Sequence, residues 1–517
     1  MKPIRLISGF LTVGVWTLLS RVLGFVRDIL IAAFLGASPV AEAFLIAFAL
    51  PNMFRRFFAE GAFNMAFVPM FSKKLESGDD PAGFARDAFA GLASILIVLT
   101  VVAQVFMPWL VLAMAGGFAA DGRLDLAVDY GRIAFIYVLF ISLAALASGL
   151  LNATGRFAAA AAAPVLLNIV LVAAMVFAHY SSDGAPETYG RYLAWGIPVA
   201  GVAQLALVWI AAKRAGFALI PRLPRMTPDL KRLAIIAAPA MLAGGVVQIN
   251  LLVGRQVASF YDGAIAWLSY ADRLYQLPLG VVAIALGVVL LPDLSRRLAA
   301  GDLDGGRDAF NRASELALAL TIPAAVALIV IPVPLVGVLF ERGAFDSDDT
   351  AATALAVMVY GLGLPAFVMQ KALQPLYFAR ADTKRPFYFA AIAMVVNAAV
   401  AIGLSMYIGY IAAALATTLA GWVMVWLLLL GSRSMGEAAR FDARFKKRVW
   451  RILLASILMG ALLLGAVLLV GPALGMETIR YGALAFIVFV GISGYFTIGH
   501  LIGAFRLAEF KAAMRRG

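Results

Sequence analysis

Apolar residues occur in long runs along the chain, and short polar segments separate these runs. A helix that crosses a bilayer needs about 20 consecutive apolar residues, and the runs are too long and uniform for the short alternating strands of a β-barrel. The pattern predicts an all-α polytopic membrane protein of about fourteen transmembrane helices. The first span ends at Gly36, and the second extends from Glu42 to Pro69. The others lie at roughly 88 to 114, 130 to 151, 158 to 180, 192 to 212, 234 to 259, 265 to 291, 314 to 340, 351 to 378, 387 to 407, 410 to 431, 450 to 471 and 479 to 504.

The second span is unusual because LPNMFRRFFAEGAFNMAFVP holds Arg55, Arg56 and Glu60 in its middle. A charge at the bilayer centre costs roughly 2.5 to 3.5 kcal/mol, so such residues usually face a polar interior or one another. Arg56 and Glu60 have the i, i+4 spacing of a helical ion pair. Arg55 points about 100° away and is available to an anion. Alternatively, both arginines lie near a helix end and extend toward lipid headgroups.

Other charges also fall within the predicted spans, and the basic ones outnumber the acidic ones. Arg21, Gly24 and Asp28 share one face of the first span by their i, i+3, i+7 spacing. Arginine suits an anionic ligand because its planar guanidinium binds phosphate oxygens in pairs and stays charged when desolvated. We therefore expect a cationic cavity, with structural salt bridges as the alternative. The basic residues are Arg21, Arg27, Arg55, Arg56, Arg255, Arg273 and Lys371, and the acids are Asp28, Glu42, Glu60 and Asp272.

Composition narrows the classes of protein further. Hydrophobic residues form 63% of the chain and charged residues 14%, which leaves no block for a soluble domain. The net charge of +13 does not indicate nucleic-acid binding, because basic residues gather in alternate short loops. That placement predicts cytoplasmic N- and C-termini and attraction to anionic membrane lipids. The chain has no cysteine and only His179 and His500, so we expect no disulfide and no metal site.

An internal repeat relates the two halves. Pro69 and the SKKL that ends at Leu75 match Pro292 and the SRRL that ends at Leu298, both at an offset of 223. Asn168 and Asn397 also match, at an offset of 229. Parallel repeats are typical of transporters with two lobes and a substrate site between them. The predicted domains are an N-terminal lobe at 1–215, a C-terminal lobe at 228–432, and two last helices with a tail at 448–517.

The last two spans contain little charge and several glycines. Gly499 and Gly503, in GHLIG, have the small-xxx-small spacing that favours close packing of helices. An apolar groove for a lipid chain is the alternative role. The sequence lacks a Walker A motif, an HExxH motif and a nucleophile elbow with a partner histidine. We therefore expect a transporter without catalytic residues or cofactors, driven by a monovalent cation gradient or by the membrane potential.

Five segments closely resemble the MurJ (MviN) family of lipid II flippases, in the multidrug/oligosaccharidyl-lipid/polysaccharide exporter superfamily. They are SRVLGFVRD, LPNMFRRFFAEGAFNMAFVP, YADRLYQLPLGV, LLPDLSRRL and FERGAF. The resemblance implies a fourteen-helix protein of the bacterial inner membrane. It implies alternating access that moves undecaprenyl-pyrophosphate-linked peptidoglycan precursor, lipid II, to the outer leaflet, and a groove for its tail between the last two helices.

The resemblance also assigns residues to the site. Family residues that line the cationic cavity fall on Arg21, Arg27, Arg55 and Arg273. Their acidic companions fall on Asp28, Glu42, Glu60 and Asp272. The chain departs from relatives in having Glu at 42 and Ala at 49, and its seventh span has no acidic residue, so a sodium site cannot be carried over.

Four alternatives to lipid II transport stay open at this point. The chain could export another polyprenyl-linked glycan, or a drug, although a cationic cavity suits a cationic drug poorly. A membrane enzyme acting on polyprenyl phosphates would need a clustered catalytic acid or histidine, which the sequence does not show. A scaffold that recruits cell-wall synthesis enzymes would tolerate single arginine-to-alanine changes.

Overall fold

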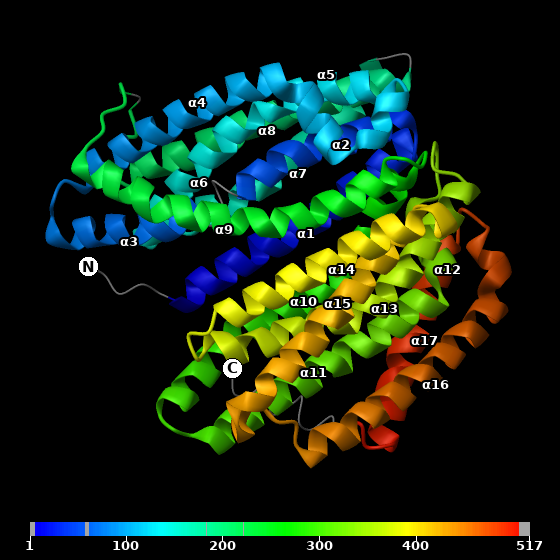
Figure 1. Cartoon of the computed structure of the whole chain (residues 1–517). Coiled ribbons are helices and arrows are strands. Elements are labelled where there is room, and N and C mark those ends of the chain that lie inside the picture. Colours follow the sequence, from blue (N-terminus) through cyan, green and yellow to red (C-terminus); the bar gives the residue numbers. More distant parts are fainter. Residues whose placement is uncertain (1–5, 57–61, 182–183, 221, 506–517) are drawn as a thin grey trace. The chain divides into compact units, whose positions relative to one another are not determined.

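The structure is a computed structural model that describes residues 6–56, 62–181, 184–220 and 222–505 (Figure 1). Within these ranges the chain is helical, apart from turns and one bridge between Arg342 and Phe345. The α-helices are α1 (Leu6–Leu35), α2 (Pro39–Arg55), α3 (Ala62–Ser77), α4 (Pro81–Met114), α5 (Arg123–Phe135), α6 (Tyr137–Ala153), α7 (Ala158–Ser181), α8 (Pro186–Arg214), α9 (Pro228–Ala258), α10 (Ala264–Ala299), α11 (Leu303–Val330), α12 (Pro332–Phe340), α13 (Ser347–Phe378), α14 (Lys384–Ile408), α15 (Ile411–Ser432), α16 (Ala443–Leu474) and α17 (Arg480–Leu501). Short 3-10 helices are η2 (Gly116–Ala120), η3 (Arg433–Met435) and η4 (Glu437–Ala439).

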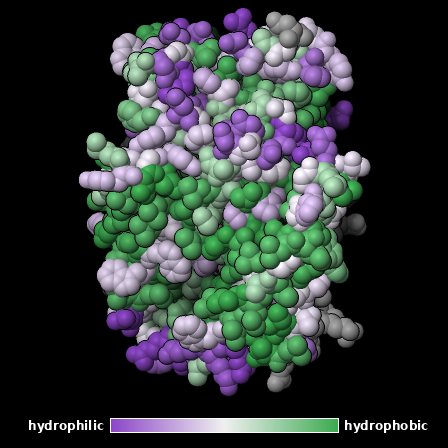
Figure 2. Space-filling view, turned by 90° about the vertical axis from the view of Figure 1, so that its right-hand side faces the viewer, coloured by the Kyte–Doolittle hydropathy of each residue, from purple (hydrophilic) through white to green (hydrophobic). Residues whose placement is uncertain are grey.

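This architecture confirms the predicted all-α membrane fold. Each predicted span coincides with one helix, or with two successive helices in the case of α2 and α3, α5 and α6, and α11 and α12. In the described part of the chain, 10 helical segments are long and apolar enough to cross a membrane. Figure 2 shows a broad area of hydrophobic side chains bordered by hydrophilic ones. The large exposed side chains of α4, among them Val98, Val105 and Trp109, are apolar, as expected for residues that face lipid.

Several helices begin before the apolar run that predicted them, because polar residues cap them. The Asp80 carboxylate accepts the Gly83 N–H at 2.8 Å and starts α4 ahead of Pro81. Thr227 accepts the Leu230 N–H at 3.2 Å and starts α9 in the same way. An N-cap side chain satisfies one of the backbone N–H groups that a helix start leaves without a partner, and proline suits the first helical position.

The chain forms two compact units. The first contains residues 1–266 together with Arg342–Phe345, and the second contains 267–341 and 346–517. In the first unit α1 packs on α7, α7 and α6 on α8, and α2 on α5. In the second unit α14 and α13 pack on α15, and α11 packs on α13 and α16.

The helix pairs agree with the internal repeat over part of its length. The α6–α8 and α7–α8 pairs of the first unit correspond to the α13–α15 and α14–α15 pairs of the second. The first helix of each repeat differs, since α1 packs on α7 whereas α9 packs on α3 and α4 and belongs to the first unit. The lobe boundaries predicted from the repeat stay a prediction, because a sequence duplication and a compact unit are different divisions of the chain.

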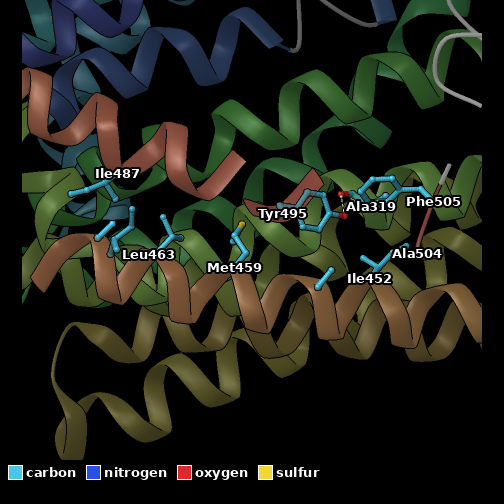
Figure 3. Packing of buried hydrophobic residues seen from close by; sticks show 11 residues of the cluster. Ala319, Ile452, Met459, Leu463, Ile487, Tyr495, Ala504 and Phe505 are labelled. Carbon is cyan, nitrogen blue, oxygen red and sulfur yellow. Dashed lines mark hydrogen bonds between the residues drawn. The ribbon is translucent and has the colours of Figure 1, made fainter. Parts of the chain in front are cut away.

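The helices α16 and α17 lie side by side and share an apolar cluster with α11 (Figure 3). Met459 and Leu463 of α16 pack with Ile487 of α17. Tyr495 is the polar member of this cluster, and its hydroxyl donates a hydrogen bond of 2.6 Å to the carbonyl of Ala319 in α11. Gly491 of α17 lies against Leu463 of α16, so a small residue allows close packing here. The predicted Gly499–Gly503 spacing does not form such a contact, because α17 ends at Leu501 and Gly503 has a φ of 70°.

Candidate functional site

Arg27 is the most completely enclosed of the candidate arginines in the first unit. It is 5% exposed and Asp28 is 7% exposed. Arg27 Nε and Nη2 donate to Asp28 Oδ1 at 3.0 and 2.7 Å, and Nη1 donates to Asn168 Oδ1 of α7 at 2.9 Å. The guanidinium also lies over the Phe48 ring of α2, 5.3 Å from its centroid. Arg27 therefore connects α1 to α7 and α2.

Asn168 completes this arrangement from the other side. Its Nδ2 donates to the carbonyl of Ser20 at 2.9 Å, and its side chain lies where a Cβ on Gly24 would meet it at 3.5 Å. Gly24 thus leaves room for the amide of α7 against α1. Gly24, which belongs to the polar face predicted for the first span, therefore lies at a helix–helix contact.

Arg21 differs from Arg27 in its surroundings. It is exposed, and it makes no hydrogen bond or ion pair with the other residues that the structure describes. Arg21 lies about two turns before Arg27 on the same helix, a rise of about 9 Å. A guanidinium with unused donors in a membrane helix is suited to bind a phosphate group.

Arg55 is the last residue of α2 and is half-buried. Its Nε donates to Asn52 Oδ1 at 3.3 Å, and Asn52 Nδ2 donates to the carbonyl of Phe48 at 2.8 Å. Phe48 and Arg55 are seven residues apart and share a helix face, and Phe48 contacts Arg27. Arg55 therefore projects from the side of α2 that faces α1.

Two predicted features of this stretch have different outcomes. Arg56 is exposed and follows the end of α2, which agrees with the alternative in which an arginine lies near a helix end. Glu60 lies outside the described residues, so its predicted pairing with Arg56 stays a prediction.

Glu42 lies in the first turn of α2 and is 1% exposed. Its Oε2 accepts a hydrogen bond of 2.7 Å from Arg123 Nη1, and its Oε1 accepts the Ile265 N–H at 3.0 Å. Arg123 also contacts Asp121 and Asp262 through Nη2, at 2.6 and 3.1 Å. The hydrogen bonds from Arg123 lower the pKa of Asp121 below its usual value.

Asp272 and Arg273 lie on α10 in the second unit, and both are half-buried. Gln276, one turn further along α10, donates a hydrogen bond to Asp272 Oδ2. The Tyr275 ring packs beside the Tyr360 ring of α13, with centroids 4.9 Å apart. The first unit thus holds Arg21, Arg27 and Arg55, and the second holds Arg273.

Sequence reasoning missed the roles of Asn168 and Arg123. Asn168 had a signal, because it is a polar residue in an apolar helix and recurs as Asn397 in the internal repeat. Arg123 also had a signal, because it is one of the few basic residues beside the loops that are predicted to lie on the non-cytoplasmic side of the membrane. Among the described residues, no group of three or more His, Cys, Asp or Glu side chains is arranged to hold a metal ion.

Comparison with known proteins decides the family. Residues 31–490 match the family described as "Lipid II flippase MurJ". The chain belongs to the MurJ family. It is 42% identical to a probable lipid II flippase MurJ of Rhizobium tropici over 99% of this chain and 97% of the relative. It is 36% identical to the lipid II flippase MurJ of Burkholderia cenocepacia, over 84% of each chain.

A solved structure of a MurJ protein supports the same family assignment. The structure titled "Lipid II flippase MurJ, inward closed conformation" aligns with a TM-score of 0.79 and 27% identity, over 95% of this chain and 98% of that one. An inward-facing MATE family transporter of the MOP superfamily aligns with a TM-score of 0.66 at 15% identity, over 81% of this chain and 95% of that one, and shows the shared fold alone. These matches confirm the family that the sequence motifs indicated.

Proposed function

We propose that this protein is a lipid II flippase that moves undecaprenyl-pyrophosphate-linked peptidoglycan precursor from the inner to the outer leaflet by alternating access. The observation that carries the proposal is the MurJ family match over residues 31–490. The relatives named as lipid II flippases extend over nearly the whole chain, at up to 42% identity. The protein acts as a transporter of the bacterial inner membrane, with both termini in the cytoplasm.

The cationic residues supply a binding site for the pyrophosphate. Arg21, Arg27, Arg55 and Arg273 carry positive charge on helices that cross the membrane in this proposal, with Asp28, Glu42, Glu60 and Asp272 as acidic companions. Their different surroundings support different roles. Arg21 is exposed and Arg55 is half-buried at a helix end, which suits direct contact with phosphate oxygens. Arg27 already donates to Asp28 and Asn168, which suits holding α1 in place.

The membrane potential is a sufficient energy source for the outward step. Moving one elementary charge through the potential involves about 2.3 kcal/mol per 100 mV. Two negative charges that move outward through an inside-negative potential therefore gain about 4.6 kcal/mol per 100 mV. A co-transported monovalent cation would reduce this gain, and measuring transport at different imposed potentials distinguishes the two modes of coupling.

The test is rescue of cells depleted of their own flippase. We would measure lipid II at the outer face in cells that express wild type, Arg21→Ala or Arg55→Ala at matched membrane levels. Arg225→Ala, which changes an exposed arginine of the loop between α8 and α9, is the control. We expect rescue by wild type and by the control, and loss in both cavity variants. Rescue by all variants would remove these arginines from the mechanism. A well-expressed wild type that fails to rescue would favour another polyprenyl-linked glycan as substrate.

A further inference from the structure

Three large apolar side chains are exposed on the loop between α8 and α9. This loop extends from residue 215 to residue 227. Ile220, Leu223 and Met226 are 58%, 84% and 75% exposed, and all three lie outside the helices. Lipid tails cover the exposed apolar side chains of a helix that crosses a membrane, but a loop does not cross it. These three side chains therefore need a partner of a different kind.

The sequence of the loop places these residues at every third position. It reads IPRLPRM, so a proline and an arginine follow Ile220 and again follow Leu223. Proline disfavours the helical conformation in the residue before it, and residues 222–227 form neither helix nor strand. In an extended proline-rich chain with three residues per turn, residues three apart share a face. Leu223 and Met226 have this spacing, and both are exposed.

Other residues of the loop are bound to the protein. Trp209 Nε1 of α8 donates a hydrogen bond of 3.0 Å to the carbonyl of Leu219, which is 1% exposed. Arg222 Nη2 donates to the carbonyl of Gly83 in α4 at 2.8 Å, and the guanidinium forms an ion pair with Asp87. The residue after Leu219 and the residue after Arg222 are both exposed. The loop is therefore fastened to α4 and α8 on one side and presents its apolar side chains on the other.

The ends of the flanking helices indicate how deep the loop lies. Ile210 is the last large exposed apolar side chain of α8, and the helix ends at Arg214, about 6 Å further on. Ile235 is the first one of α9, about 10 Å beyond the start of that helix at Pro228. A bilayer of about 40 to 45 Å with a hydrocarbon core of about 30 Å leaves about 5 to 7 Å for the headgroups of each leaflet. The loop therefore lies near the headgroup layer.

The charges around the loop favour a membrane over a protein as its partner. Lys213, Arg214, Arg225, Lys231 and Arg232 are all exposed. Cationic side chains beside apolar ones are complementary to lipid headgroups, whose phosphates are negative and cover apolar acyl chains. The core of a protein interface is instead depleted of charged residues, and of lysine in particular.

We propose that Ile220, Leu223 and Met226 form an interfacial anchor that inserts into the headgroup layer of the membrane, with Arg225 bound to headgroup phosphates. The apolar side chains leave water at the boundary between headgroups and acyl chains, and the long arginine side chain extends back to the phosphates. The partner is the bulk phospholipid of the bilayer, and no part of this inference depends on lipid II. Failure of the anchor and failure of the proposed function are therefore separate results.

Site-specific fluorescence tests the anchor in the whole protein. The chain has no cysteine, so Leu223→Cys or Met226→Cys can carry a single NBD label. Both changes affect exposed side chains and should leave the fold intact. Ser77→Cys, at the exposed last residue of α3 in the same unit, is the control. We would place each labelled protein in phospholipid nanodiscs, where both faces are open to water. One quencher is a phospholipid with a nitroxide near the top of its acyl chain, and the other is aqueous iodide.

We expect the nitroxide lipid to reduce the fluorescence of the Leu223→Cys and Met226→Cys labels by a larger factor than iodide does. The Ser77→Cys label should show the reverse order. Quenching of all three labels by iodide alone would overturn the anchor. Protection of the two loop labels from both quenchers would also overturn it and would indicate a protein surface, formed by a second copy of this chain if the protection disappears in nanodiscs that hold one copy.

Discussion

Arg27 and Arg21 lie on the same helix, but their replacement should have opposite consequences. Arg27→Met leaves Asp28, which is 7% exposed, without the guanidinium that donates to it at 2.7 and 3.0 Å. Removing one partner of a buried ion pair costs about 3 to 5 kcal/mol in soluble proteins. The change also removes the bond of 2.9 Å to Asn168. We expect the free energy of unfolding to fall by about that amount.

Two matched variants separate the ion pair from a general effect of losing an arginine. Arg21→Met changes an exposed side chain and should alter the free energy of unfolding by no more than about 0.5 kcal/mol. The double variant Arg27→Met with Asp28→Asn removes both charges, and replacing both members of a buried pair is often nearly neutral. We therefore expect the double variant to recover most of the stability that the single variant loses.

Thermal unfolding in detergent, followed by circular dichroism, measures these differences. Lipid II exposure in depleted cells, at matched membrane levels, measures function separately. Arg21→Met should fold normally and fail to rescue, whereas Arg27→Met should have a lowered melting temperature. A melting temperature of Arg27→Met equal to that of wild type would refute the structural role of the pair, as would a double variant that melts no higher than the single one.

Three further results follow from the structure. Gly343→Ala should lower the melting temperature more than Gly184→Ala. Both glycines have positive φ, of 59° and 81°, so the backbone strain is common to the two variants. Only the Cβ at Gly343 would also collide with a neighbour, because it would lie 2.2 Å from the Ala33 carbonyl oxygen. Tyr495→Phe should lower the unfolding free energy by about 1 to 3 kcal/mol by leaving a buried carbonyl without its donor, measured in the same way. Asp121→Asn should be less stable than wild type above pH about 4, because the variant loses the charged hydrogen bond with Arg123 that lowers the pKa of Asp121. Acid-unfolding curves measure this difference in stability, which should vanish once the pH is below that lowered pKa.

The helices could be predicted from the sequence because membrane insertion depends on a local property. A run of about 20 apolar residues is sufficient to specify a span. The breaks between α5 and α6 at Ile136 and between α11 and α12 at Ile331 could not be predicted in this way, because apolar residues continue across both. Membership of α9 in the first unit likewise depends on its packing against α3 and α4, which hydropathy does not record.

The sequence named the charged residues of the candidate site but did not predict their contacts. Helical spacing grouped Arg21 with Asp28 on one face, whereas the ion pair forms between the adjacent residues Arg27 and Asp28. Adjacent residues point about 100° apart on a helix, so helical spacing does not predict this pair. The bond to Asn168 joins residues 141 apart in the sequence, so it required the three-dimensional packing of α1 on α7.

Under the proposed function, the hydrogen bonding of each charge assigns some charges to helix packing and others to transport. A charge that is already hydrogen-bonded within the protein, as at Glu42 and Arg27, stabilises helix packing, and an incoming phosphate would have to break those bonds first. An exposed guanidinium such as Arg21 has donors to offer without that cost. Burial and bonding therefore separate the charges that hold the helices from those that the proposed function assigns to the substrate, although all of them look alike in the sequence.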